Sequence, residues 1–414
     1  MKNILKNYKS TLILVAAVVI GVVVGLLFKD VGVMVKPLGD IFINLLLVII
    51  VPLIFLTITT AISKMGSPKR LGKIMVTTLI MFIVTSLVAV IVGFATTYFV
   101  PLVDAGDSTA IMEGLDMTET GGDVELSILE RTASLVTVGS FGELLTTDNL
   151  IALLVFSILF GIAINMAKEK GESARKLLDS LHEVIMKLLK LIMYYAPVGI
   201  GAYAAYLTST FGASIAVGYL KVFVIYTLVA VLYYFIVYTV YAYIAGRMEG
   251  VKRFWKNVIP ATVTSLTTCS SAASIPVNSM CAKNVGVSDD IADTVIPLGT
   301  SFHKDGSIIG SVFKIMFLVC LFGTNISSFG SIGKVLLVAL IATLLVTAVP
   351  IGGGTISEMM IITMMGYGVG TLPILTIIAT VIDPPATMLN VVGDLSTSMM
   401  VSRVVDGKKW MKKK

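Results

Sequence analysis

The sequence predicts an all-α membrane protein that crosses the bilayer many times, and two observations support this fold class. The chain is 56% hydrophobic and only 14% charged, whereas soluble domains carry about 25% charged residues. Its apolar residues also gather in eight runs, each long enough to cross a hydrocarbon core about 30 Å thick as a helix. The runs cover residues 11–28, 41–63, 75–103, 150–167, 184–208, 213–245, 291–323 and 373–404.

The lysines and arginines orient these eight predicted transmembrane helices, because short loops rich in them stay in the cytoplasm. Basic residues cluster before the first run, after the second, fourth and sixth runs, and in the tail 405–414. The long loop 104–149 is acidic and has one arginine and no lysine. We therefore expect a multi-pass protein of the cell membrane, surrounded by lipids, with both termini in the cytoplasm. The net charge of +6 is spread over these loops, so nucleic acid is not an expected partner.

Two further apolar segments do not fit simple spans. Residues 257–283 are interrupted by the serine- and threonine-rich stretch 264–276, and residues 334–367 by the glycine-rich stretch 350–355. Lipid cannot satisfy the backbone groups that such breaks expose. If either segment crossed the bilayer alone, the basic tail would end outside, so both are predicted to be re-entrant helical hairpins that enter from opposite sides.

Each predicted hairpin is followed by a span that carries polar residues, 291–323 and 373–404. The chain thus contains a hairpin followed by a broken helix twice, in opposite orientations. Inverted repeats with interrupted helices near the membrane midplane are typical of secondary transporters. No nucleophile–base pair or phosphate-binding loop is evident, and the three cysteines and two histidines lack metal-type spacing. We expect neither an enzyme, a cofactor nor a transition metal.

The first polar span contains His303, Lys304 and Asp305 side by side. An ionised side chain at bilayer depth costs roughly 2.5–3.5 kcal/mol on insertion scales, so three titratable groups indicate a site for ions or a charged solute. Gly306 is expected to let the helix unwind and expose carbonyl groups. Asp305 is a candidate cation ligand or a partner of Lys304. The alternative is a buried ion pair that only holds helices together.

The last polar span contains Asp383, Asn390 and Asp394, and two adjacent prolines follow Asp383. The prolines are expected to kink the helix and expose carbonyl groups. Asn390 and Asp394 are four residues apart, so they share a helix face and are candidate cation ligands. Asp383 is a candidate partner for a substrate ammonium. The alternative for Asp394 is an ion pair with Arg403 near the membrane end.

The hairpin tips are candidate substrate contacts. Hydroxyl and N–H groups of the tip 264–276 are suited to hold a carboxylate, as helix N-termini do, or else they form a polar packing seam. The tip 350–355 is a candidate gate because of its place in the repeat, or else a flexible loop. Lys314 is expected to extend its ammonium to the membrane interface. The tyrosines in 219–243 are expected to serve packing.

The order of these motifs resembles the dicarboxylate/amino acid:cation symporter family, which includes glutamate transporters and their archaeal homologues. The resemblance covers nearly the whole chain and is carried by 39–42, 51–55, 194–200, Ser270-Ser271, 297–299, Asp305-Gly306 and 390–394. It implies a homotrimer that takes up a small molecule by an elevator movement. It also implies a scaffold domain, formed by residues 1–72 and by the first two of the three helices in 150–246. The transport domain then consists of the third of these helices and of residues 73–103, 255–323 (first hairpin and helix seven) and 331–404 (second hairpin and helix eight).

The resemblance also implies roles for individual residues. Those implied to bind substrate are Ser270, Ser271, Ser307, Asp383, Thr387, Asn390, Gly353 and Gly354. Those implied to bind cations, Na⁺ and/or H⁺, are Thr85, Ser86, Gly299, Ser301, His303, Asp305, Asn390 and Asp394.

Several positions depart from the family pattern, among them Ser307, which replaces a threonine, and the unusual pair Pro384-Pro385. His303 and Lys304 replace an asparagine and a methionine, Phe82 replaces a tyrosine, and Ala386 and Cys269 stand where members carry arginine. Without the arginine at 386, a neutral amino acid is favoured over glutamate.

Lys304 is a candidate coupling residue. Like charges about 4 Å apart repel by roughly 4 kcal/mol at an effective dielectric near 20, so its ammonium would replace one or more sodium ions. Two alternatives remain open. One is a symporter for a dicarboxylate or acidic amino acid with proton coupling through Lys304 and His303. The other is a membrane sensor of the same fold that does not transport.

Overall fold

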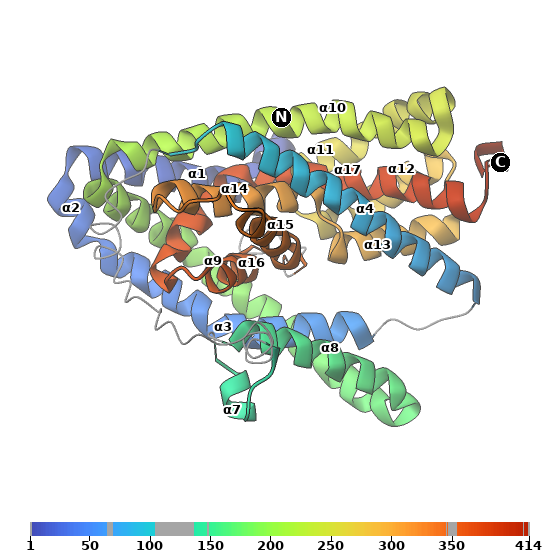
Figure 1. The fold of residues 1–414 in the computed structure, drawn as a ribbon, viewed down its shortest axis with the longest axis horizontal. Coiled ribbons are helices and arrows are strands. Elements are labelled where there is room, and N and C mark those ends of the chain that lie inside the picture. Colours follow the sequence, from blue (N-terminus) through green and yellow to red (C-terminus); the bar gives the residue numbers. More distant parts are fainter. Residues whose placement is uncertain are drawn as a thin grey trace.

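The computed structural model describes residues 2–63, 69–103, 136–146, 149–344, 346, 354–408 and 410–412. Within these ranges all regular structure is helical, which confirms the all-α prediction (Figure 1). The α-helices are α1 (Lys2–Leu27), α2 (Lys29–Met34), α3 (Lys36–Ser63), α4 (Lys69–Phe99), α7 (Phe141–Leu144), α8 (Leu150–Met166), α9 (Glu172–Phe211), α10 (Ala213–Asn257), α11 (Ile259–Thr268), α12 (Ser271–Val285), α13 (Asp289–Phe302), α14 (Asp305–Leu321), α15 (Phe329–Thr343), α16 (Thr355–Met365) and α17 (Leu372–Val405).

Each of the eight predicted spans coincides with one helix or, for 291–323, with the consecutive pair α13 and α14. Among the described residues, five helical segments are long and apolar enough to cross a membrane: Lys29–Thr60, Gly72–Phe99, Lys168–Thr210, Ile215–Asn257 and Val369–Val405. The chain is therefore a multi-pass membrane protein. The number of crossings and the orientation of the termini stay predictions.

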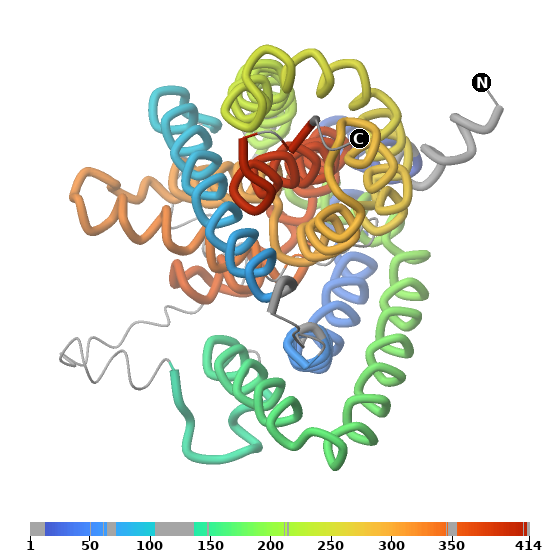
Figure 2. The backbone as a smooth tube through the Cα atoms, turned by 90° about the vertical axis from the view of Figure 1, so that its right-hand side faces the viewer, coloured from blue at the N-terminus to red at the C-terminus, as the bar shows by residue number. Residues whose placement is uncertain are grey.

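The helices pack in two groups. In the first, α9 contacts α1, α2 and α3, and α3 also contacts α8. In the second, α17 lies at the centre and is surrounded by α4, α10, α11, α12, α13 and α14 (Figure 2). The groups meet where α1 touches α11 and α17 and where α9 touches α10 and α17, and α3 and α8 also touch α16. The predicted division into scaffold and transport domains stays a prediction, because contacts within one conformation do not reveal which group moves.

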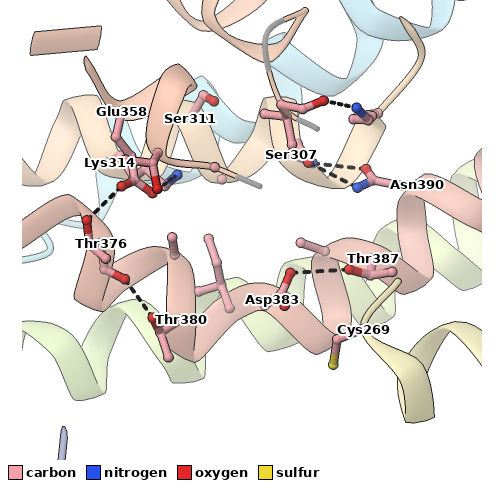
Figure 3. A pocket seen from close by; sticks show the side chains of 18 of the residues that line it. Cys269, Ser307, Ser311, Lys314, Glu358, Thr376, Thr380, Asp383, Thr387 and Asn390 are labelled. Atoms are coloured by element: carbon pink, nitrogen blue, oxygen red, sulfur yellow. Dashed lines mark hydrogen bonds and ion pairs between the residues drawn. The ribbon is translucent and has the colours of Figure 1, made fainter. Parts of the chain in front are cut away.

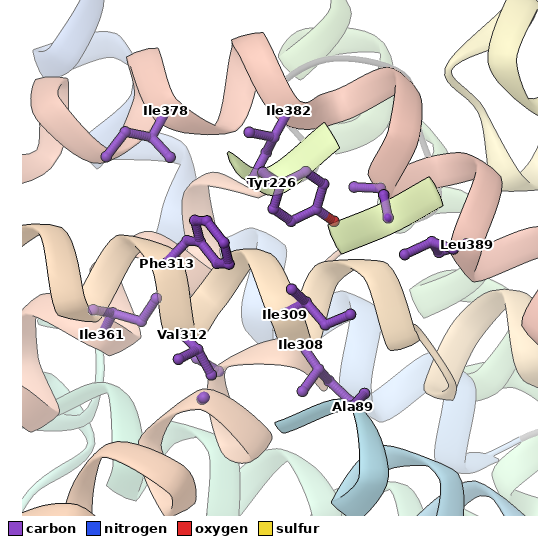
Figure 4. Close-up of a cluster of buried hydrophobic side chains, with 14 of the residues drawn as sticks. Ala89, Tyr226, Ile308, Ile309, Val312, Phe313, Ile361, Ile378, Ile382 and Leu389 are labelled. Atoms are coloured by element: carbon purple, nitrogen blue, oxygen red, sulfur yellow. The ribbon is translucent and has the colours of Figure 1, made fainter. Parts of the chain in front are cut away.

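Burial is greatest along α17, where every residue from Ala386 to Ser402 is buried. Apolar side chains fill the space between α17 and α14, and α10, α4 and α16 close this core from other sides (Figure 4). The labelled members are Ala89, Tyr226, Ile308, Ile309, Val312, Phe313, Ile361, Ile378, Ile382 and Leu389. This rigid packing holds the polar residues of α14 and α17 in fixed positions.

The first predicted hairpin is present as α11 and α12, which pack against each other. The break falls at Cys269, whose backbone is left-handed (φ 48°), and at Ser270. The hydroxyl of Ser270 caps α12 by accepting a hydrogen bond from the backbone N–H of Ala273 at 3.2 Å. The second hairpin consists of α15 and α16, which also pack together. Of its predicted tip, only Gly354 and Thr355 belong to the described residues, so Gly353 lies outside them.

The predicted break in the first polar span exists, but not at Gly306. The backbone is extended at His303 and Lys304, between the end of α13 and the start of α14. Gly306 is helical, and its missing side chain serves close packing instead. A Cβ there would lie 2.2 Å from the carbonyl oxygen of Ala386.

The last span is not interrupted as predicted, and the predicted kink at its prolines stays a prediction. Helix α17 continues from Leu372 to Val405 with Pro384 and Pro385 inside it. A proline removes a backbone hydrogen bond, but neighbouring helices keep such a helix intact in a membrane protein by re-satisfying the freed groups. The two halves of the repeat therefore differ in this respect.

Candidate functional site

One pocket brings together polar residues from both hairpins, α14 and α17 (Figure 3). On α17 the lining residues recur every three or four positions, which places them on one face of the helix. On α14 they recur in the same way from Ser307 to Lys314. The polar and charged lining residues used below are Ser271, Lys304, Ser307, Lys314, Glu358, Thr376, Asp383, Thr387 and Asn390.

Asn390 and Ser307 join the two helices at one end of the pocket. The backbone N–H of Ser307 donates to Asn390 Oδ1 at 3.1 Å, and Asn390 Nδ2 donates to Ser307 Oγ at 3.0 Å. Asn390 thus points to the pocket and not to Asp394, although the two share a helix. The predicted joint cation site of these two residues stays a prediction, and here the side chain of Asn390 is used by Ser307.

Asp383 lies in the middle of the pocket, as Figure 3 shows. The hydroxyl of Thr387 donates to its Oδ1 at 3.3 Å. Its Oδ2 is buried and has no hydrogen-bond partner among the described residues. A buried carboxylate oxygen without a partner is costly, so this atom is suited to accept a hydrogen bond from a ligand.

Lys304 is buried at the helix break and lines the same pocket. Its ammonium donates to the backbone carbonyl groups of Ser301, at 3.4 Å, and Val346. In the part of the chain that the structure describes, no ion pair joins it to a carboxylate, so the predicted pair with Asp305 is not made. Its positive charge is available to an anionic group of a ligand.

Lys314 and Glu358 form a buried ion pair at the other end of the pocket. Lys314 Nζ lies 3.1 Å from Glu358 Oε1, and Thr376 donates to Glu358 Oε2 at 2.8 Å. The expectation that Lys314 extends to the interface is therefore wrong, because its side chain is only 7% exposed. The sequence could have indicated that Lys314 lines the pocket, since it follows Ser307 by seven residues and so shares its helix face.

His303 is buried and precedes the pocket residue Lys304 in the chain, and its imidazole ring stacks on Phe82 with centroids 4.5 Å apart. Nδ1 lies 2.9 Å from Asp394 Oδ1, and Nε2 lies 2.7 Å from the hydroxyl of Thr85 and 3.0 Å from Asp305 Oδ1. The ring therefore sits between two carboxylates.

The hydrogen positions on this ring follow from its partners. The hydroxyl of Thr85 has one hydrogen. When it donates this hydrogen to the carbonyl oxygen of Met81, 2.9 Å away, its oxygen accepts from Nε2. An ionised Asp394 only accepts, so Nδ1 also donates. A histidine that donates from both nitrogens is an imidazolium. The cluster of Thr85, His303, Asp305 and Asp394 is thus suited to hold a proton on the imidazole, and below we call it the histidine cluster.

Tyrosines of α10 complete the surroundings of the histidine cluster. Tyr233 donates to Asp305 Oδ2 at 3.3 Å. Tyr238 lies 3.4 Å from the same oxygen, but its shorter hydrogen bond, 2.6 Å, goes to the carbonyl of Leu389. Tyr226 donates to the carbonyl of Gly306 at 2.7 Å. The interpretation of these tyrosines as packing residues missed their polar contacts, which no local pattern reveals.

The remaining predicted cation ligands differ in their positions. Gly299 lies directly against the Asp394 carboxylate. Ser86 is half-buried, and Ser301 is exposed, with its hydroxyl donating to the carbonyl of Pro297 in its own helix. The alternative pair of Asp394 with Arg403 is not made, because Arg403 donates to the carbonyl of Lys408 instead.

Comparison with known proteins gives a match over most of the chain. The model of the sodium:dicarboxylate symporter family matches residues 11–404. The chain is similar to a C4-dicarboxylate transport protein of Bacillus subtilis (strain 168), with 31% identity over 329 residues that cover 78% of this chain and 76% of the relative. It is also similar to a proton/sodium-glutamate symport protein of Bacillus caldotenax, with 26% identity over 397 residues, 93% of this chain and 92% of the relative.

Proposed function

Because the chain belongs to the sodium:dicarboxylate symporter family, we propose that it is a secondary active symporter for a small neutral amino acid. One observation carries this choice of substrate. The pocket contains one carboxylate oxygen without a partner, on Asp383, and one ammonium without a carboxylate partner, on Lys304, among the described residues. These two charges complement the ammonium and the carboxylate of a zwitterion.

The first hairpin supports the same assignment. Ser271 opens α12 and lines the pocket, and the start of a helix favours an anion. The carboxylate of the substrate would lie between this helix start and Lys304. Ala386 also lines the pocket and supplies no charge for a side-chain carboxylate.

We further propose that the coupling ion is a proton held by the histidine cluster. Hard cations such as Ca²⁺ need several oxygen ligands at about 2.3–2.6 Å. The imidazolium of His303 already uses the oxygens of Thr85 and Asp394 and faces Asp305. It therefore replaces a sodium ion that these oxygens would otherwise bind.

Loss of this proton changes the contacts of the ring. A neutral imidazole donates from only one nitrogen, so either Asp394 faces a lone pair or Thr85 must turn its hydroxyl away from Met81. The titratable groups near the ring are Asp305, Asp394, Lys304, Tyr233 and Tyr238. Because His303 is the chain neighbour of Lys304, which lines the pocket, its protonation and substrate binding would influence each other.

A second candidate substrate is a dicarboxylate or acidic amino acid, again coupled to protons. The observation that favours it is the buried Lys304 ammonium in the pocket. The similar proteins whose names mention C4-dicarboxylates and glutamate support it too.

Uptake of labelled substrates into proteoliposomes tests these proposals. Neutral amino acids, glutamate and succinate should be compared under an inward proton gradient and, separately, under an inward sodium gradient. We expect a neutral amino acid to accumulate with protons alone. Uptake of only the acidic substrates would support the second candidate, and strict sodium dependence without any response to pH would refute proton coupling.

The trimer and the elevator movement are also part of the proposal. Their support is the resemblance of the motifs and the packing of the helices in two groups. Cross-linking in native membranes measures the number of subunits, and a band at the mass of three chains is expected.

A further inference from the structure

The ion pair of Lys314 and Glu358 has no role in binding the ammonium and carboxylate of an amino acid. The side chains are 7% and 1% exposed, and both line the substrate pocket. They come from different elements, α14 and α16, and Thr376 of α17 holds the second oxygen of Glu358 at 2.8 Å. A buried ion pair is costly to desolvate and is weak evidence for stability, so its place in the pocket points to a ligand.

Helix geometry gives the separation between the ion pair and the residues proposed to hold the zwitterion. Thr376 and Asp383 are seven residues apart on α17, which is two helical turns, or about 10 Å. Ser307 and Lys314 have the same separation on α14. A substrate whose ammonium is bound by Asp383 would therefore extend its side chain along both helices toward Lys314 and Glu358 (Figure 3).

The length of the side chain can be compared with this separation. An extended glutamine measures about 6 Å from its ammonium nitrogen to its amide nitrogen. With a hydrogen bond of about 2.9 Å at each end, it spans about 12 Å. A five-carbon amino acid therefore reaches the ion pair, whereas alanine or serine leaves this end of the pocket empty.

The opposite charges of Lys314 and Glu358 determine which substrate side chain they accept. A carboxylate would be attracted by Lys314 but repelled by Glu358, and an ammonium would meet the opposite combination. A carboxamide has an oxygen that accepts from Lys314 and an NH₂ group that donates to Glu358. It thus satisfies both partners without adding a charge.

We propose that Lys314 and Glu358 form a side-chain subsite that selects an amino acid with a carboxamide side chain, of the glutamine type, over one with a charged side chain. This inference rests on the proposed function, since it specifies the substrate of the same pocket. The competing explanation is that the pair only clamps α16 to α14 and α17.

Binding measurements on the purified full-length protein separate these explanations. Dissociation constants are measured for glutamine, glutamate, lysine and alanine with the unmodified protein and with Glu358→Gln and Lys314→Met. In Glu358→Gln the remaining lysine should improve binding of glutamate relative to glutamine at least tenfold. In Lys314→Met the remaining carboxylate should improve binding of lysine relative to glutamine at least tenfold. These shifts in opposite directions follow from the charge that is left unpaired.

Two further variants serve as controls for this test. Lys283→Met removes a lysine from an ion pair with Asp293 outside the pocket, and it should change no ratio. If a single variant does not fold, the double variant Lys314→Gln/Glu358→Gln removes both charges together. It should keep glutamine binding while its discrimination against glutamate falls at least tenfold.

The outcomes are distinct. Variants that lower the thermal stability but leave every ratio unchanged would show a clamp and overturn the subsite. A double variant with undiminished discrimination would overturn it as well. If no amino acid binds to the unmodified protein, the proposed function itself fails, and the subsite fails with it.

Discussion

A methyl group at position 299 would test how closely the histidine cluster is packed. A Cβ on Gly299 would lie 2.1 Å from Asp394 Oδ1, about 1.3 Å short of the 3.4 Å at which ordinary contact begins. In Gly299→Ala, α13 and the carboxylate on α17 must therefore move apart by about this amount. Overpacking of this kind costs roughly 1–3 kcal/mol of stability.

The same displacement affects the proton on His303. Asp394 Oδ1 is 2.9 Å from Nδ1 of the ring, so a shift of about 1.3 Å takes the oxygen out of hydrogen-bond range. A hydrogen bond to a charged group contributes roughly 1.5–3 kcal/mol, and each 1.4 kcal/mol is a factor of ten in an equilibrium constant. The proton concentration needed for half-maximal uptake should therefore rise roughly 10- to 100-fold.

The assay is uptake into proteoliposomes over a series of external pH values, together with thermal unfolding of the purified variant. Gly333→Ala is a matched control, because Gly333 also lies within a helix and a Cβ there meets nothing within 4 Å. If Gly299→Ala behaves like Gly333→Ala in both measurements, then Asp394 does not stabilise the coupling proton on His303 and the reasoning is refuted.

Three further predictions concern other parts of the site. His303→Asn removes the imidazole and introduces the asparagine that the family resemblance implies at this position, so uptake should lose its response to protons and gain dependence on sodium; flux measured with and without sodium decides this. Asp383→Asn removes the partner of the substrate ammonium and should weaken binding of amino acids at least tenfold while sparing dicarboxylates, as measured by calorimetry. Gly306→Ala would place a Cβ 2.2 Å from the carbonyl oxygen of Ala386, and should lower stability by about 3 kcal/mol in thermal or denaturant unfolding. An unchanged midpoint would contradict the close packing of α14 on α17.

Much of the fold could be predicted because its signals are local. A span reveals itself by a run of apolar residues, and the hydroxyl-rich stretch around Ser270 and Ser271 predicted the break that the structure has between α11 and α12. Asp305 and Asp394 were candidates because a charge in lipid is costly wherever it occurs. The prolines of α17 misled the same reasoning, since the effect of a proline depends on neighbours that the sequence does not reveal.

The pairing of the polar residues could not be predicted in the same way. His303 and Asp394 are 91 positions apart, and Lys314 and Glu358 are 44 apart. Nothing local indicates that Asp305 faces His303 and not its neighbour Lys304. The non-helical backbone between α13 and α14 decides which residue Asp305 faces, because it directs the side chains of His303 and Lys304 to opposite sides.

The sequence by itself determined that this chain is a helical membrane protein with two interrupted hairpins and buried charges near His303 and Asp383, because burial in lipid imposes its cost on every residue separately. Only the tertiary structure decided which charges meet. The packing of α4, α14 and α17 surrounds the imidazole of His303 with oxygens from three helices. It also leaves Lys304 and Asp383 in the pocket without a charged partner among the described residues. Such contacts depend on the relative positions of whole helices, and that information is distributed over the entire core.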